Sequence, residues 1–330
     1  MKYKIRIGAA IFASALAFTA CSSDTSTEST TTSAEEPEEL RTIRLAAVPV
    51  VDVAALYLGS EVGIFEEHGL ELDIQFTPGS SVAIPAMLND DFDAVYTGSV
   101  NAYQARETGL PVVAIAEGGR TTGEAGADHG GILVHPDSDI QDPGDLEGKE
   151  VAVNAVLGLH EAADRQSIIK AGGDPNKANF LELDLPDMLG ALENGNVDAI
   201  STSEPFLGLG LDAGMELIAD PFIDVDEEFI TAVYLTSEQN VAENTELIND
   251  FISAVKESQE YASENTEEFR QELTNFAEID PEVAETMILT KFGWGFPDEP
   301  MQRGAEASRE AGIINDVDKA LDGLVRSEDQ

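Results

Sequence analysis

Several short loops of the chain carry hydroxyl, amide or carboxylate side chains directly after an apolar stretch with strand character. In an open α/β sheet, ligands bind outside the carboxyl ends of the strands, where helix N-termini offer free N–H groups. These loops therefore predict a binding site for a small polar solute. The candidate ligand contacts within them are Asp52, Ser80, Ser81, Thr97, Ser99, Asn101 and Asn154. The alternative is that Asp52 and the hydroxyl groups are ordinary helix N-caps.

The residue patterns of common catalytic and metal sites do not occur in the sequence. There is no Gly-x-Ser-x-Gly motif, and the four histidines form no His-Glu-x-x-His pair. Asp128, His129 and His135 are close in sequence, but their spacing fits no strong metal-binding rule, so we expect solvated loop residues. One cysteine excludes an intramolecular disulfide and a cysteine-based zinc site. We expect no enzyme activity, no metal and no cofactor.

Positive charge is scarce near the candidate loops. Arg120 is the cation that we include among the candidate ligand contacts, whereas Arg165 lies in a predicted helix and is expected to form a surface ion pair. A small oxyanion would then be held mainly by backbone N–H groups and hydroxyls. The same polar groups would serve a zwitterion or a heterocycle, so the sequence leaves the ligand undecided.

The charge of the whole chain excludes other classes of partner. Eighteen Lys and Arg residues against 64 Asp and Glu residues give a net charge of −46. A surface this negative repels phosphate backbones and anionic headgroups, which argues against nucleic-acid binding and against docking to a membrane by charge. A hydrophobic fraction of 42% over 330 residues is enough for a folded protein with two cores.

The first 39 residues have the features of an export and anchoring segment. A basic start precedes an apolar run at 7–18, which spans only about 18 Å of a bilayer core of about 30 Å. Residues 16–21 resemble a bacterial lipoprotein box, which implies a signal peptide at 1–20 and lipidation of Cys21. Residues 21–39 should form a disordered tether, since Ser, Thr and acidic residues dominate them. We expect a lipid-anchored protein on the extracytoplasmic face of the cell membrane, which contacts the membrane only through its lipid.

The body beyond residue 40 alternates strand-like and helix-like segments, which predicts an α/β fold with largely parallel sheets. Apolar spacing predicts helices at 54–65 and from residue 80 to 89, and only helices after residue 240. We place Trp294 in the core or beside the hinge. The predicted strands are 42–51, 70–76, 94–97, 112–116, 131–135, 150–154, 180–184, 199–203 and 230–236, and the predicted C-terminal helices are 241–262, 266–277, 281–291, 298–311 and 316–326.

Three stretches of the body resemble one protein family. They are AALYL at 54–58 with GIFEEHGL at 63–70, DLEGKEVAV at 145–153, and the segment 188–205, which contains VDA and ends in Ser-Glu-Pro. In this order they resemble the nitrate/sulfonate/taurine branch of the type II periplasmic substrate-binding proteins of ABC importers. The resemblance covers nearly all of residues 42–330.

The resemblance implies two α/β lobes, each a mixed sheet flanked by helices, with a ligand cleft between them and a helical C-terminal segment. Lobe one would comprise 40–131 and 234–330, and lobe two 132–233. The resemblance also adds His160, Glu204, Phe206 and Tyr234 to the candidate ligand contacts, with packing as the alternative for the two aromatic residues.

The function that the resemblance implies is that of a monomeric receptor, which captures a sulfonate, nitrate or taurine-type solute for an ABC permease and ATPase. A pyrimidine, riboflavin or another heterocycle is the alternative ligand. A pyrimidine-precursor synthase shares the fold, but it would require a cysteine-rich iron-binding motif that this sequence lacks. A sensor subunit that presents its ligand to a membrane receptor stays open.

Overall fold

The structure is a computed structural model that describes residues 39–276 and 279–326. The expected signal peptide, the lipidation of Cys21 and all but the last residue of the tether lie outside the described residues. In the part of the chain that is described, no helix is both long enough and apolar enough to cross a membrane.

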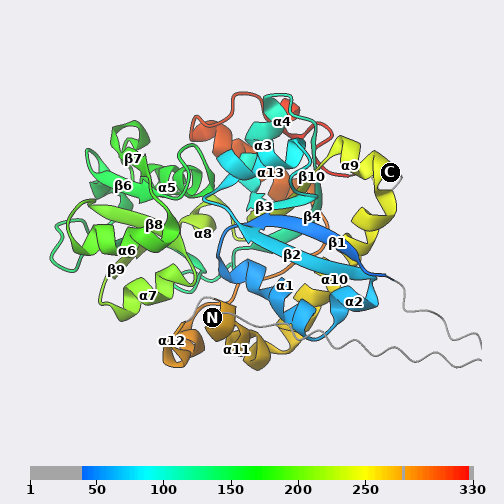
Figure 1. The fold of residues 1–330 in the computed structure, drawn as a ribbon. Coiled ribbons are helices and arrows are strands. Elements are labelled where there is room, and N and C mark those ends of the chain that lie inside the picture. The colour runs from blue at the N-terminus through cyan, green and yellow to red at the C-terminus, as the bar shows by residue number, and fades with distance from the viewer. Residues whose placement is uncertain (1–38, 277–278, 327–330) are drawn as a thin grey trace, which may run out of the picture. The chain divides into compact units, whose positions relative to one another are not determined.

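The first sheet has five strands in the order β2-β1-β3-β10-β4 (Figure 1). β1 pairs in parallel with β2 and β3, whereas β10 runs antiparallel to its neighbours β3 and β4. Four strands therefore share one direction and β10 opposes them. The strands are β1 (Arg41–Ala47), β2 (Leu70–Phe76), β3 (Ala94–Gly98), β4 (Val112–Arg120) and β10 (Ile230–Ser237).

The second sheet repeats this plan in the order β7-β6-β8-β5-β9. β6 is parallel to β7 and β8, and β5 opposes both β8 and β9. β5 is the first strand that the chain forms after it leaves the first sheet. β10 is the strand that it forms when it returns from the second sheet to the first. The predicted pair of mixed sheets is confirmed. The strands are β5 (Gly130–Val134), β6 (Glu150–Val153), β7 (Asn179–Glu182), β8 (Ala199–Ser203) and β9 (Glu216–Ala219).

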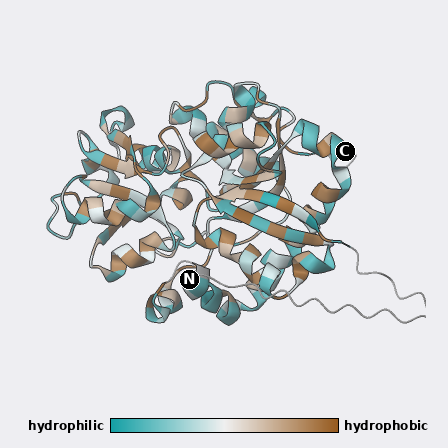
Figure 2. Ribbon diagram, in the orientation of Figure 1, coloured by the Kyte–Doolittle hydropathy of each residue, from teal (hydrophilic) through white to brown (hydrophobic). Residues whose placement is uncertain are grey.

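Helices cover both sheets, with apolar faces turned inward and polar faces outward (Figure 2). In the first part of the chain they are α1 (Val51–Glu61), α2 (Ile64–Glu67), α3 (Ser80–Leu88), α4 (Ser99–Glu107), the 3-10 turns η1 (Pro143–Leu146) and η2 (Pro175–Lys177), α5 (Leu159–Lys170), α6 (Leu185–Glu193), α7 (Phe206–Asp212) and α8 (Pro221–Val225). The C-terminal helices are α9 (Glu238–Glu243), α10 (Thr245–Glu264), α11 (Thr266–Phe276), α12 (Pro281–Thr286), α13 (Asp298–Glu310) and α14 (Val317–Leu321).

Four predicted helices differ from the structure. The helix predicted at 241–262 is divided at Asn244 into α9 and α10, and the helix predicted at 316–326 ends at Leu321. The helix predicted at 54–65 is broken, because Gly63 takes a left-handed conformation (φ 90°) between α1 and α2. The helix predicted at 281–291 ends at Thr286, and the chain then extends until Lys291 forms a bridge with Arg120 at the end of β4. Pairing with a sheet therefore overrides helical spacing here.

The C-terminal helices contact elements of both lobes. α10 packs along α1 beside the first sheet, and α13 contacts α5 of the second lobe. There Gln166 Nε2 donates to the carbonyl oxygen of Ala307 at 3.1 Å, a bond buried between the lobes. The placement of Trp294 in the core is wrong: its side chain is 38% exposed and lies against the ammonium group of Lys256.

Candidate binding site between the two sheets

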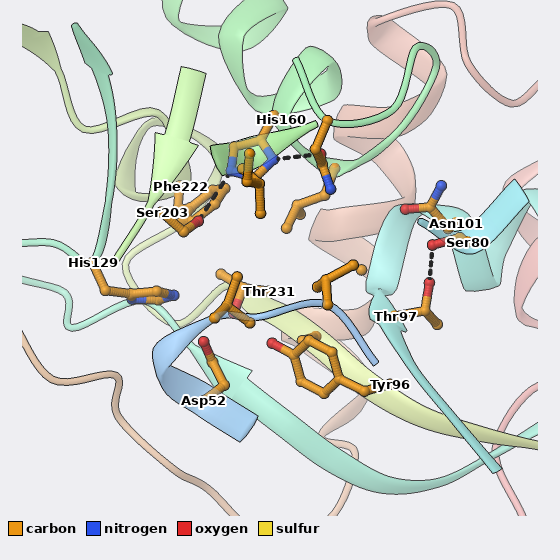
Figure 3. Close-up of a pocket in the computed structure, with 17 residues that line it drawn as sticks. Asp52, Ser80, Tyr96, Thr97, Asn101, His129, His160, Ser203, Phe222 and Thr231 are labelled. Carbon is orange, nitrogen blue, oxygen red and sulfur yellow. Dashed lines mark hydrogen bonds between the residues drawn. The ribbon is translucent and has the colours of Figure 1, made fainter. Parts of the chain in front are cut away.

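A pocket lies where the two sheets face each other, with an empty volume of about 520 Å³ including its open mouth (Figure 3). Loops after β1, β3, β6 and β8 line it, as expected for the carboxyl ends of parallel strands. Val50, Leu159, Leu185 and Phe222 supply apolar surface. Apolar walls with a few placed polar groups are typical of small-molecule sites.

The first lobe lines the pocket with hydroxyl and amide groups at two helix starts. The hydroxyls of Ser80 and Thr97 share a short hydrogen bond, and Asn101 lies in the first turn of α4. The N-caps of α3 and α4 are Gly79 and Gly98, and neither helix has a side-chain cap. The N-cap alternative for these hydroxyls is therefore wrong.

Gly98 also sets how closely the lobes approach. A Cβ atom built on Gly98 would lie 2.8 Å from Cβ of Leu159, at the start of α5 in the second lobe. Real Cβ atoms essentially never come this close. The absence of a side chain at this position therefore permits the contact between the starts of α4 and α5.

The second lobe contributes a histidine with both ring nitrogens engaged. Nδ1 of His160 lies 2.9 Å from Oδ1 of Asn154, and Nε2 lies 3.0 Å from Oγ of Ser203. Burial, helped by the charge of His129, lowers the pKa of His160 to about 4. A neutral ring that donates from Nδ1 to Asn154 and accepts at Nε2 from Ser203 satisfies both bonds. His160 thus ties the loop after β6 to the end of β8.

The floor of the pocket contains Asp52, Tyr96, His129 and Thr231. Oδ1 of Asp52 accepts a hydrogen bond from Thr290 at 2.9 Å, and α1 has no side-chain cap, so the alternative that Asp52 caps α1 is wrong. Burial raises the pKa of Asp52, although the charge of His129 and the bond from Thr290 oppose that shift. Tyr96, His129 and Thr231 were absent from the sequence-based candidates.

Asp128 and His129 are not the solvated loop residues that we expected. Both are buried, with 0% and 2% exposure. Oδ1 of Asp128 lies 3.1 Å from Nδ1 of His129, and its carboxylate also accepts from the Thr121 hydroxyl and the Thr122 backbone N–H. The signal in the sequence was their position directly before β5, at the crossing between the lobes.

Six sequence candidates do line the pocket, and the other six lie outside its lining. Asp52, Ser80, Thr97, Asn101, Asn154 and His160 are within it. Ser81, Ser99, Arg120, Glu204, Phe206 and Tyr234 are not among the lining residues. The contact of any of them with a ligand stays a prediction.

Ion pairing and packing explain the outlying positions. Arg120 makes two 2.6 Å hydrogen bonds to the buried carboxylate of Glu117 and a third to Glu228, so its guanidinium is turned away from the pocket. Glu204 accepts from the backbone N–H groups of Gly208 and Ile288, at 2.9 and 3.1 Å. Burial raises the pKa of Glu204 despite these bonds.

The remaining outlying candidates pack elsewhere. Tyr234 is fully buried between the rings of Tyr96 and Phe251, in the middle of β10. Phe206 packs against the apolar core at the start of α7. Ser81 is exposed on α3, and Ser99 is buried at the first turn of α4.

Comparison with known proteins places the chain in a family. The family model described as NMT1/THI5 like matches residues 50–269. The chain belongs to the NMT1/THI5-like family. A relative of this NMT1/THI5-like protein is YtlA of Bacillus subtilis (strain 168), named as a binding protein, with 23% identity over 264 residues, which cover 77% of this chain and 76% of YtlA.

Solved structures share the fold of this NMT1/THI5-like protein. The alkanesulfonate-binding protein SsuA from Xanthomonas axonopodis pv. citri, bound to MOPS, superposes with a TM-score of 0.73 at 16% identity, over 87% of this chain and 99% of SsuA. The nitrate-binding protein NrtA from Synechocystis PCC 6803 gives 0.72 at 15% identity, over 87% and 86% of the two chains. The desulfurization enzyme DSZB gives 0.59 at 15% identity, over 87% and 96%. These similarities confirm the periplasmic-binding-protein fold.

Proposed function

We propose that this protein is the solute-binding component of an ABC importer, which captures a small polar solute between two lobes without making or breaking a bond. The observation that carries the proposal is a pocket lined by polar groups of both sheets. A ligand that contacts both lobes binds the closed state more tightly than the open one, so binding drives closure. The lobes would be 40–131 with 234–330, and 132–233.

The solute class comes from the structural relatives and from the pocket. SsuA and NrtA are named for alkanesulfonate and nitrate, which supports a sulfonate, nitrate or taurine-type solute. A pyrimidine, riboflavin or another heterocycle is the alternative, and the apolar surface supplied by Phe222, Leu159 and Leu185 favours it. No lysine or arginine lines the pocket within the described residues, which weakens the case for a simple oxyanion.

The cellular location that we propose follows from the first 39 residues. Removal of a signal peptide at 1–20 and lipidation of Cys21 would hold a monomer on the extracytoplasmic face of the cell membrane, on a tether at 21–39. The permease and ATPase would then be its partners. Cys21→Ser should release the protein into the soluble fraction; a variant that stays with the membrane would contradict the anchor.

A hydrolase is the second candidate function, because Ser203, His160 and Asn154 have the spacing of a nucleophile, a base and an orienting group. Asn154 carries no charge that could stabilise an imidazolium ion, and the pKa of His160 is lowered to about 4 by burial and His129. His160 is therefore a weak base near neutral pH. We expect no labelling of Ser203 by a fluorophosphonate; a covalent adduct on Ser203 would favour the hydrolase.

Thermal-shift screening tests the proposed function. The protein is heated with sulfonates, nitrate, taurine, pyrimidines and flavins, and a bound solute stabilises it by RT ln(1 + [L]/Kd), or about 2.7 kcal/mol at a hundredfold excess. Small-angle scattering with and without each stabilising solute then reports closure. A solute that is chemically converted, or the absence of stabilisation by every member of these classes, would contradict the proposal.

A further inference from the structure

The two histidines of the pocket differ in what they can offer a ligand. Both nitrogens of His160 already have partners, Asn154 and Ser203, at 2.9 and 3.0 Å. A ligand could bond to that ring only by displacing one of these partners. His160 therefore has a structural role in the pocket wall, although it was the histidine that the sequence favoured as a ligand contact.

His129 has one nitrogen engaged and one available. Nδ1 is held by Asp128 at 3.1 Å, and no hydrogen bond within residues 39–276 and 279–326 engages Nε2. The ring lines the pocket and points into it from the side of β5. Phe222 of α8 packs against the ring with centroids 5.4 Å apart, which helps to fix its orientation.

The titratable groups that face His129 determine whether Nε2 carries a hydrogen that it can donate. They are Asp128 on its own loop, Asp52 of α1, Glu204 after β8, and His160 of α5. Burial alone would lower the pKa of His129, but the hydrogen bond to Asp128 and the three carboxylates outweigh it and raise the pKa. A protonated ring donates from Nε2 into the pocket.

Beside His129, Asp52 contributes a hydrogen-bond acceptor and Thr231 a hydroxyl group to the lining of the pocket. Asp52 has Oδ1 fixed by Thr290, and its carboxylate faces the hollow beside His129 (Figure 3). Thr231 is 2% exposed and lines the pocket, yet its hydroxyl has no hydrogen-bond partner among the described residues. A buried hydroxyl without a partner is uncommon in folded proteins and points to a ligand that supplies one.

We propose that His129, positioned by Asp128, is the histidine that selects the solute, and that with Asp52 and Thr231 it favours an uncharged solute with an adjacent acceptor and N–H donor, such as an amide, over an oxyanion. The acceptor takes the hydrogen of Nε2, and the donor binds the Asp52 carboxylate. An oxyanion would instead lie beside the Asp52 carboxylate in a pocket lined by no lysine or arginine of the described residues, which is a repulsive balance. The inference rests on the proposed function.

The test uses two probes, nicotinamide and nicotinate, which differ only in that a neutral carboxamide in the first is replaced by a carboxylate in the second. Long-range ¹H–¹⁵N spectra of the full chain, labelled with ¹⁵N-histidine, resolve the four rings. We expect nicotinamide to shift the Nε2 resonance of His129 and to leave His160 unchanged, with nicotinate binding at least about tenfold more weakly. Nicotinate binding as well as nicotinamide, or no effect of either on His129 at millimolar concentration, would overturn the inference.

Variants make the assignment independent of one substitution. His129→Asn should abolish the binding of nicotinamide. His135→Asn, at a residue whose side chain is 40% exposed, is the matched control and should bind nicotinamide like the wild type. Asp128→Asn retains the ring but removes its charged partner, so nicotinamide affinity should fall while the chain stays folded. If the solute screen succeeds but only anions bind, the inference fails and the proposed function stands; if no solute binds, both fail.

Discussion

His160→Gln tests whether the buried imidazole is held neutral by the fold. Burial, with a smaller effect of the charge on His129, lowers the pKa of His160 to about 4, against about 6.5 in an unfolded chain. Between these values the unfolded state binds more protons than the folded state. The stability that the neutral ring contributes is therefore complete above about pH 6.5 and is lost as the pH falls toward 4.

The linkage relation sets the size of this effect. Between pH 7 and pH 4.5 it amounts to about 2.5 kcal/mol for His160 alone. Urea unfolding of wild type and His160→Gln at both values isolates it, because the carboxylates and His129 titrate in both proteins and cancel in the difference. His135→Gln is the control and should follow wild type. Equal losses in wild type and His160→Gln would refute a buried neutral ring.

Three further substitutions separate binding from stability. Gly98→Ala places a methyl group 2.8 Å from Leu159, so solute affinity measured by calorimetry should fall about 5- to 150-fold, from an overpacking cost of about 1–3 kcal/mol. Gly79→Ala, where the nearest atom is 3.8 Å away, should not change it. Thr231→Val removes a hydroxyl without a partner, so the melting temperature should hold or rise while nicotinamide binding weakens. Arg120→Ala leaves the Glu117 carboxylate buried without its cation and should cost about 3–5 kcal/mol in urea unfolding, with solute affinity per folded molecule unchanged.

Much of the fold could be predicted from the sequence, because strand and helix spacing depends on local burial. The breaks that were missed depend on single backbone events. Gly63 interrupts one helix through a left-handed conformation, and the extension that ends at Lys291 exists only because β4 offers an edge for pairing. Neither event leaves a trace in apolar spacing.

Half of the candidate site could be predicted for a reason that is equally local. A polar residue at or just after the end of a parallel strand lies at the carboxyl edge of its sheet, and Thr97 and Asn154 reach the pocket in this way. Arg120 also follows a strand of that direction, but β4 is the outermost strand of its sheet, and Glu117 holds the side chain there. Proximity to a strand end was insufficient without the strand order.

Two of the residues that sequence reasoning missed, His129 and Thr231, share one topological cause. β5 and β10 run against the other strands of their sheets, so their beginnings, and not their ends, meet the carboxyl edge. Gly130 pairs with Ser203 at the end of β8, and Ala232 pairs with Gly98 at the end of β3. His129, directly before β5, and Thr231, second in β10, are thereby carried into the pocket. The two crossings that join the lobes thus also supply His129 and Thr231 to the pocket. In the proposed function the lobes would move about these same crossings, which would couple solute recognition to closure.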